Sequence, residues 1–140
     1  MRITEAPRRN STVMVVDDEP RICQFFEKTL GEEGYDVVTA TSGRRALALA
    51  PVVRPDLVLL DIMMPDLDGI ATLRELRRCG YGGAVVILTG RANIQTAREA
   101  MVLGAYEYIT KPFNLEFLKS VVWKGIGEGI KRSKEALCVR

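Results

Sequence analysis

The chain has 140 residues, a length that fits one ordinary globular domain. It is 47% hydrophobic and 27% charged, close to the average of soluble proteins, so its composition argues against disorder. It contains no histidine, which excludes histidine-based catalytic triads and a role as a histidine phosphocarrier. The net charge of +2 is unevenly spread: the two ends are basic, whereas residues 11–123 carry 12 basic and 15 acidic side chains. Basic ends can contact nucleic acid, but solvated termini are more common, and we expect no direct nucleic-acid contact from this domain.

The sequence also bears on where the protein acts. No apolar run approaches the roughly 20 residues needed to cross a bilayer, and the first residues lack the apolar stretch of a signal peptide. The cysteines, Cys23, Cys79 and Cys138, are odd in number and lack metal-ligand spacing, which is typical of reduced thiols. We therefore expect a cytoplasmic protein with no membrane segment.

The first half of the chain alternates short apolar runs with amphipathic segments. The clearest helix starts near Pro20, a residue favoured in the first turn, and ends at Gly34. Its side chains Ile22, Phe26 and Leu30 recur at helical spacing on one face. The predicted elements are, in order, a strand over 12–17, a helix over 20–34, a strand over 35–40, a helix over roughly 44–49 and a strand over 56–61.

The second half repeats the pattern and ends in a helix with an apolar stripe that includes Leu118, Val122 and Ile126. Three glycines, at 125, 127 and 129, each weaken a helix by about 1 kcal/mol relative to Ala, so we place the end of the domain at residue 130. The predicted elements before that helix are a helix over 70–79, a strand over 84–89, a helix over 94–103 and a strand over 106–110. The predicted division is an N-terminal tail over 1–11, a domain over 12–130, and a C-terminal tail or the start of a linker over 131–140.

Five strand–helix repeats predict an α/β fold. Three of the strands are almost continuously apolar, as expected when helices cover both faces of a parallel sheet. Right-handed crossovers then favour a doubly wound sheet, which binds ligands beyond the carboxyl ends of its strands.

Polar residues follow or end four of these strands: Asp17 and Asp18, Asp61, Thr89, and Lys111. Crowded carboxylates repel one another unless they share a cation, and oxygen ligands favour a hard metal such as Mg²⁺. A lysine and a hydroxyl beside them suit phosphate oxygens, and an aspartate can act as the nucleophile in phosphoryl transfer. Each residue alone has an ordinary explanation as a cap, a turn or a surface charge, but their joint placement indicates a phosphoryl-transfer site.

At these residues the chain resembles a known family. The segments VVDDEP, LLDIMMPDLDG, VVILTG and GAYEYITKPF occur in the order typical of bacterial two-component receiver domains, and the resemblance covers roughly residues 12–130. It implies a (βα)5 sandwich with the flavodoxin-like strand order 2-1-3-4-5. It implies Asp61 as the phosphoacceptor. It also implies Mg²⁺ held by Asp18, Asp61 and the Met63 backbone carbonyl, with Asp17 acting through water.

The resemblance implies roles for further residues. Thr89 and Lys111 would contact the phosphoryl group, Thr89 and Tyr108 would form the switch, and the peptide bond between Lys111 and Pro112 would be cis. We hypothesise that the long side chains of Met63 and Arg91 tune the phosphoryl lifetime by slowing attack by water.

The resemblance also implies partners. The donor would be a sensor histidine kinase or a histidine phosphotransfer protein. The output would be a downstream protein or an effector domain, with a homodimer as a further candidate. The chain would be a signalling phosphoacceptor that catalyses only its own phosphorylation and dephosphorylation. The contact face would lie on the fourth helix, fifth strand and fifth helix, with the surface residues Arg98, Glu99, Glu107 and Lys119.

Other classes stay open as alternatives. A haloacid-dehalogenase-type phosphatase needs a second Asp two positions after the nucleophile, where this chain has Met63. A flavodoxin-like cofactor binder needs a Ser/Thr-rich loop after the first strand, where this chain has DDEP. A phosphate-independent interaction module leaves the carboxylates and the lysine unexplained. We expect no DNA-binding domain within this chain. The alternative to a receiver that acts on a separate partner is therefore the receiver half of a truncated transcriptional regulator whose DNA-binding output domain is missing.

Overall fold

The sheet confirms the predicted fold class. The structure, a computed structural model, describes residues 11–91 and 93–139. Its five strands are parallel and lie in the order β2-β1-β3-β4-β5. The strands are β1 (Thr12–Val16), β2 (Asp36–Ala40), β3 (Leu57–Leu60), β4 (Ala84–Thr89) and β5 (Glu107–Thr110).

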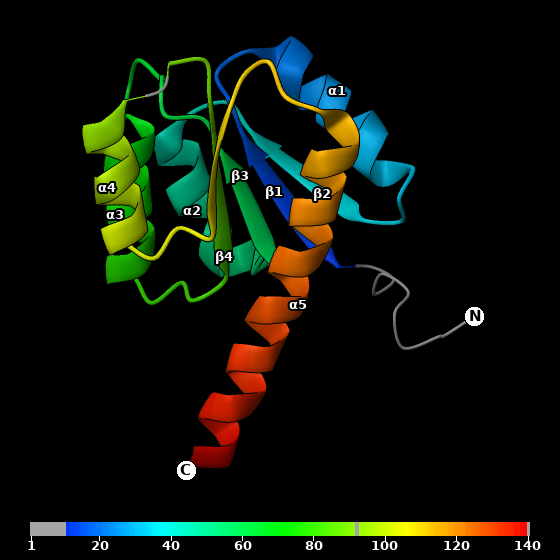
Figure 1. Cartoon of the computed structure of the whole chain (residues 1–140), viewed down its shortest axis with the longest axis vertical. Coiled ribbons are helices and arrows are strands. Elements are labelled where there is room, and N and C mark those ends of the chain that lie inside the picture. The colour runs from blue at the N-terminus through cyan, green and yellow to red at the C-terminus, as the bar shows by residue number, and fades with distance from the viewer. Residues whose placement is uncertain (1–10, 92, 140) are drawn as a thin grey trace.

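The five helices cover both faces of this sheet (Figure 1). α1 and α5 pack on one face, and α2, α3 and α4 pack on the other. The helices are α1 (Pro20–Gly31), α2 (Gly43–Val53), α3 (Gly69–Arg78), α4 (Ile94–Val102) and α5 (Leu115–Val139).

The central strand β3 shows why its sequence is continuously apolar. Leu57 and Leu59 pack in the core beneath α1 and α5, whereas Val58 and Leu60 pack in the core beneath the other three helices. All four side chains are at most 2% exposed. Successive strand residues point to opposite faces, so a strand buried on both sides needs apolar residues at every position. The first polar side chain at this end of β3 is therefore that of Asp61, the residue that follows the strand.

Two helices extend beyond their predicted ends. The predicted end of α2 was residue 49, but the helix includes Pro51 and ends at Val53, with Arg54 in the left-handed conformation. Pro51 lies in the last turn, where its missing N–H costs one helical hydrogen bond. The N–H of Arg54 still donates to the Ala50 carbonyl and closes the helix.

The helix α5 continues past residue 130, the predicted end of the domain, and projects beyond the sheet (Figure 1). The glycines do not end it because one of them serves packing. A Cβ on the buried Gly125 would lie 2.8 Å from Leu57 Cδ1 and 3.3 Å from Tyr106 Cδ2. Gly125 therefore lets α5 lie close against the sheet, whereas a Cβ on Gly127 would meet open space. Among the described residues no helix is both long and apolar enough to cross a membrane.

These two glycines give a matched pair of substitutions. Gly127→Ala should raise the free energy of unfolding by up to about 1 kcal/mol, because alanine favours the helix and meets nothing. Gly125→Ala gains the same propensity but crowds a filled core, and overpacking costs about 1–3 kcal/mol. Urea unfolding should therefore show Gly125→Ala less stable than Gly127→Ala. Equal stabilisation of both variants would contradict this packing.

Candidate functional site

The structure confirms that the five predicted positions share one edge of the sheet. Asp17 and Asp18 follow β1, Asp61 follows β3, Thr89 ends β4, and Lys111 follows β5. The parallel register pairs Val16 with Leu60, so the residues after them are neighbours. Backbone hydrogen bonds continue this pairing, from Asp61 N to the Val16 carbonyl at 3.0 Å and from Lys111 N to the Thr89 carbonyl at 2.8 Å.

Three carboxylates converge at this edge. One oxygen each from Asp17, Asp18 and Asp61 lies within 4.8 Å of the other two. Asp17 is 3% exposed and Asp61 is 7% exposed, while Asp18 is partly buried. Burial raises the pKa of Asp61, and the charges of the two neighbouring carboxylates raise it further. The Met63 N–H and the Lys111 ammonium oppose this rise. Oxygen ligands this close fit a small hard cation such as Mg²⁺.

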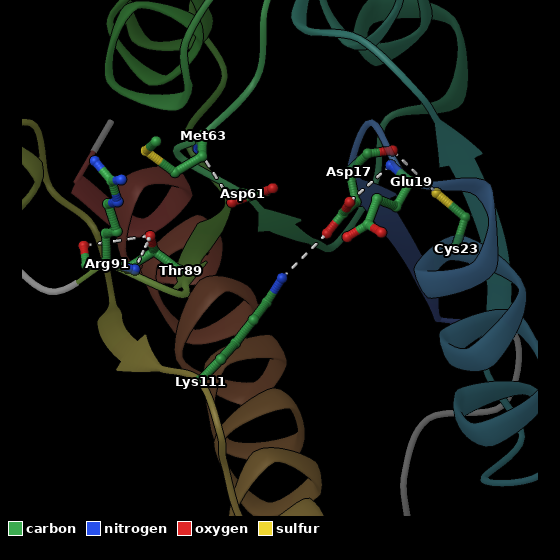
Figure 2. A network of polar contacts seen from close by, with 8 residues as sticks. All are labelled: Asp17, Glu19, Cys23, Asp61, Met63, Thr89, Arg91 and Lys111. Carbon is green, nitrogen blue, oxygen red and sulfur yellow. Dashed lines mark hydrogen bonds and ion pairs between the residues drawn. The ribbon is translucent and has the colours of Figure 1, made fainter.

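Lys111 reaches into the carboxylate cluster from the end of β5. Its Nζ lies 3.5 Å from Asp17 Oδ2, and its side chain is 26% exposed (Figure 2). The other oxygen of Asp17 accepts a hydrogen bond from the Glu19 N–H at 2.9 Å. The two oxygens of Asp17 are thus held by different partners, which fixes the position of this buried carboxylate. The peptide bond between Lys111 and Pro112 is cis, as the resemblance implied.

The loop after β3 brings the backbone of Met63 against Asp61. The Met63 N–H donates to Asp61 Oδ1 at 3.1 Å, and the Met63 side chain is 49% exposed. The other end of this loop also lies close to Asp61. A Cβ on Gly69 would be 2.5 Å from the Asp61 carbonyl oxygen. Only glycine allows α3 to begin there. The role of the Met63 carbonyl as a metal ligand stays a prediction.

The two switch candidates are engaged with other partners. Thr89 is fully buried, and its Oγ1 accepts a hydrogen bond from the Arg91 N–H at 3.1 Å (Figure 2). Tyr108 is partly buried, and its Oη lies 3.1 Å from Oγ1 of Thr96 on α4. Sequence reasoning missed Thr96, because nothing in the local pattern of α4 marks it as a partner of β5.

Thr96 also lines a groove that it shares with the loop that carries Met63. A groove of about 570 Å³ lies between this loop, α3 and α4, and both Met63 and Thr96 line it. The partner of Tyr108 therefore shares one surface with the residues next to Asp61.

One predicted surface residue points elsewhere. Lys119 was expected on the face formed by α4, β5 and α5, but its Nζ pairs with Glu33 Oε2 at 3.2 Å. Glu33 lies between α1 and β2, so Lys119 faces α1. This part of the prediction was wrong, because the helical stripe alone does not show which neighbour each side of α5 meets. The other three candidates are exposed or partly exposed: Arg98, Glu99 and Glu107.

Comparisons with known proteins agree on one family. The family model of the response regulator receiver domain matches residues 13–122. The regulatory protein AtoC of Escherichia coli is 36% identical over 114 residues, which cover 81% of this chain and 25% of AtoC. The probable transcriptional regulatory protein TcrX of Mycobacterium tuberculosis is 39% identical over 105 residues, 75% of this chain and 45% of TcrX. This chain therefore spans a quarter to a half of the length of these curated relatives.

The fold likewise has a close match among solved structures. The crystal structure of a CheY-like response regulator receiver domain protein from Methanospirillum hungatei superimposes with a TM-score of 0.84. It is 28% identical, and the match covers 88% of this chain and 98% of that one.

The contact between Gly69 and Asp61 gives a test of the site's geometry. Gly69→Ala should lower the free energy of unfolding by about 1–3 kcal/mol, because the new methyl group meets backbone that cannot move without shifting the loop. Gly31→Ala, at the end of α1 with nothing within 4 Å, is the control and should be neutral or slightly stabilising. Urea unfolding of both variants measures the difference, and a neutral Gly69→Ala would rule out this close approach.

Proposed function

The chain belongs to the family of response regulator receiver domains, and on that basis we propose that Asp61 accepts a phosphoryl group from the phosphohistidine of a sensor kinase or phosphotransfer protein. The observation that supports this most is the gathering of three carboxylates and Lys111 at the carboxyl edge of the sheet. A pure interaction module would have no use for buried like charges at one edge, since burying them without a partner is costly.

Each residue of the site has a separate role in the phosphoryl transfer. Asp61 Oδ1 is held by the Met63 N–H, and the second oxygen, Oδ2, attacks phosphorus. The O–P bond forms as the N–P bond to the donor imidazole breaks, and the imidazole leaves with its electron pair and takes up a proton. Lys111 neutralises charge on the transferring oxygens. Thr89 contributes its hydroxyl once it leaves the Arg91 N–H.

The three carboxylates fit the Mg²⁺ ion that receiver chemistry requires. We propose that Asp18, Asp61 and the Met63 carbonyl hold the ion directly and that Asp17 acts through water. The bound ion would neutralise charge on the phosphoryl oxygens. Asp17 suits the indirect role because both of its oxygens already have partners in the Glu19 N–H and Lys111.

The signal would leave through Tyr108 and the face formed by α4, β5 and α5. Movement of Thr89 toward the phosphoryl group would change the space beside the tyrosine, and phosphorylation would favour one of two pre-existing arrangements. The relatives are full-length regulators, so the partner of this face is an effector domain or a separate downstream protein. If the partner is the effector domain of a transcriptional regulator, as the name of TcrX suggests for that relative, the output is transcriptional control.

Phosphorylation of Asp61 can be measured directly. Incubation with acetyl phosphate and Mg²⁺ should add one phosphoryl group, seen by intact-mass spectrometry and lost on treatment with hydroxylamine. Asp61→Asn should gain none, because the amide cannot form an acyl phosphate. Asp36→Asn, on an exposed carboxylate at the opposite end of β2, is the control and should be phosphorylated like the wild type. An equal gain of mass by Asp61→Asn would contradict the assignment.

The lifetime of the phosphoryl group tests the roles of Met63 and Arg91. Both side chains are exposed next to the site, and we expect them to obstruct attacking water. The double variant Met63→Asn, Arg91→Glu should shorten the lifetime by about tenfold, which corresponds to about 1.4 kcal/mol in the hydrolysis barrier. Met101→Asn, on a methionine that is similarly exposed on α4, should leave the lifetime unchanged. Loss of radioactive phosphate over time gives the measurement, and an unchanged double variant would remove this hypothesis.

A further inference from the structure

The first turn of α2 is capped by two residues that are far apart in the sequence. A helix begins with backbone N–H groups that have no partner inside the helix. Ser42 Oγ accepts from the Arg45 N–H at 3.0 Å. The N–H groups of Gly43 and Arg44, the first two residues of the helix, donate to the carboxylate of Asp66 at 3.4 and 3.3 Å. Asp66 does not belong to α2 but to the loop between β3 and α3.

Close packing joins the same two parts. A Cβ on Gly43 would lie 2.8 Å from the Leu67 carbonyl oxygen and would collide with Thr72 Oγ1. Thr72 Oγ1 in turn donates to the Asp68 carbonyl at 2.9 Å. The start of α2 is therefore fitted against the loop over 66–68, and Asp66 holds the loop there by its charge.

Other parts of this loop contact the proposed phosphoacceptor Asp61 and its neighbour Ile62. Met63 N–H donates to Asp61 Oδ1, and the Gly69 N–H donates to the Ile62 carbonyl at 2.9 Å. Met63 and Asp66 are three residues apart in a short loop whose two ends are joined by the hydrogen bond between Gly69 and Ile62. We infer that Asp66 is a positioning residue for phosphorylation, which anchors the Met63 peptide at the metal and phosphoacceptor site by capping α2. This inference rests on the proposed function.

The charge of Asp66 suits this anchor. Desolvation acts to raise its pKa, but hydrogen bonds from the backbone N–H groups of Leu67, Arg44 and Gly43 outweigh it and lower the pKa. The carboxylate is therefore ionised at neutral pH and faces the positive end of the α2 dipole. Because Asp66 is exposed, a capping role alone predicts only a modest loss of stability. The positioning role predicts in addition that the site itself changes.

The experiment separates these two roles by Mg²⁺ affinity. Calorimetric titration with Mg²⁺ should show Asp66→Ala binding about tenfold more weakly than the wild type, the lower end of what loss of a group that orients metal ligands causes. Asp66→Asn keeps an acceptor oxygen and the fold, so it should recover part of the affinity. Asp36→Ala, far from the site, should bind as the wild type does. Phosphorylation by acetyl phosphate should slow in the same order.

Hydrogen exchange at the start of α2 gives a second measurement. Coupling is reciprocal, so Mg²⁺ binding should also tighten the cap and slow hydrogen exchange at the Gly43 and Arg44 N–H groups. Wild-type Mg²⁺ affinity in Asp66→Ala, with only a loss of stability, would overturn the inference and leave the proposed function standing. A wild type that neither binds Mg²⁺ nor gains a phosphoryl group would overturn both.

Discussion

The repulsion among three neighbouring carboxylates, two of them buried, is the constraint around which this molecule is organised. One oxygen each from Asp17, Asp18 and Asp61 lies within 4.8 Å of the other two, so each pair of ionised carboxylates repels. There are three such pairs, and Lys111 forms its ion pair with only one of the three acids, Asp17. A single lysine offsets part of this repulsion, and the proposed Mg²⁺ ion would offset more of it.

The fold maintains this arrangement because the strands allow no alternative. β1 and β3 are apolar at every buried position, and their helices fill both faces, so neither strand can slide without exposing its core. The acids stand immediately after these strands, and their positions follow from the register of Val16 with Leu60. The loop that follows Asp61 is then fixed by Gly69 at its far end and by Asp66 at α2. The strand register, Gly69 and Asp66 thus act together to hold the carboxylates of the site in place.

The parts that sequence predicted well are those that depend on local pattern. The apolar runs marked each strand within one residue at either end, and strand ends in a parallel sheet necessarily meet at one edge, so Asp17, Asp61 and Lys111 could be placed together. The parts that failed depend on contacts between distant elements. The glycines of α5 predicted an early end to the helix, but Gly125 packs against Leu57, a residue far away in the sequence. Lys119, Thr96 and Asp66 have partners on other elements, and no spacing rule within one helix or loop identifies them.

The measurement that bears most directly on this account is a Mg²⁺ titration of the isotope-labelled protein at neutral pH, followed through backbone amide NMR signals. A metal site at this edge of the sheet predicts a saturable shift centred on Asp17, Asp18, Asp61 and Met63, with little change at exposed acids such as Asp36. It would be contradicted if no signal saturates, or if the shifts are spread evenly over the acidic residues of the surface.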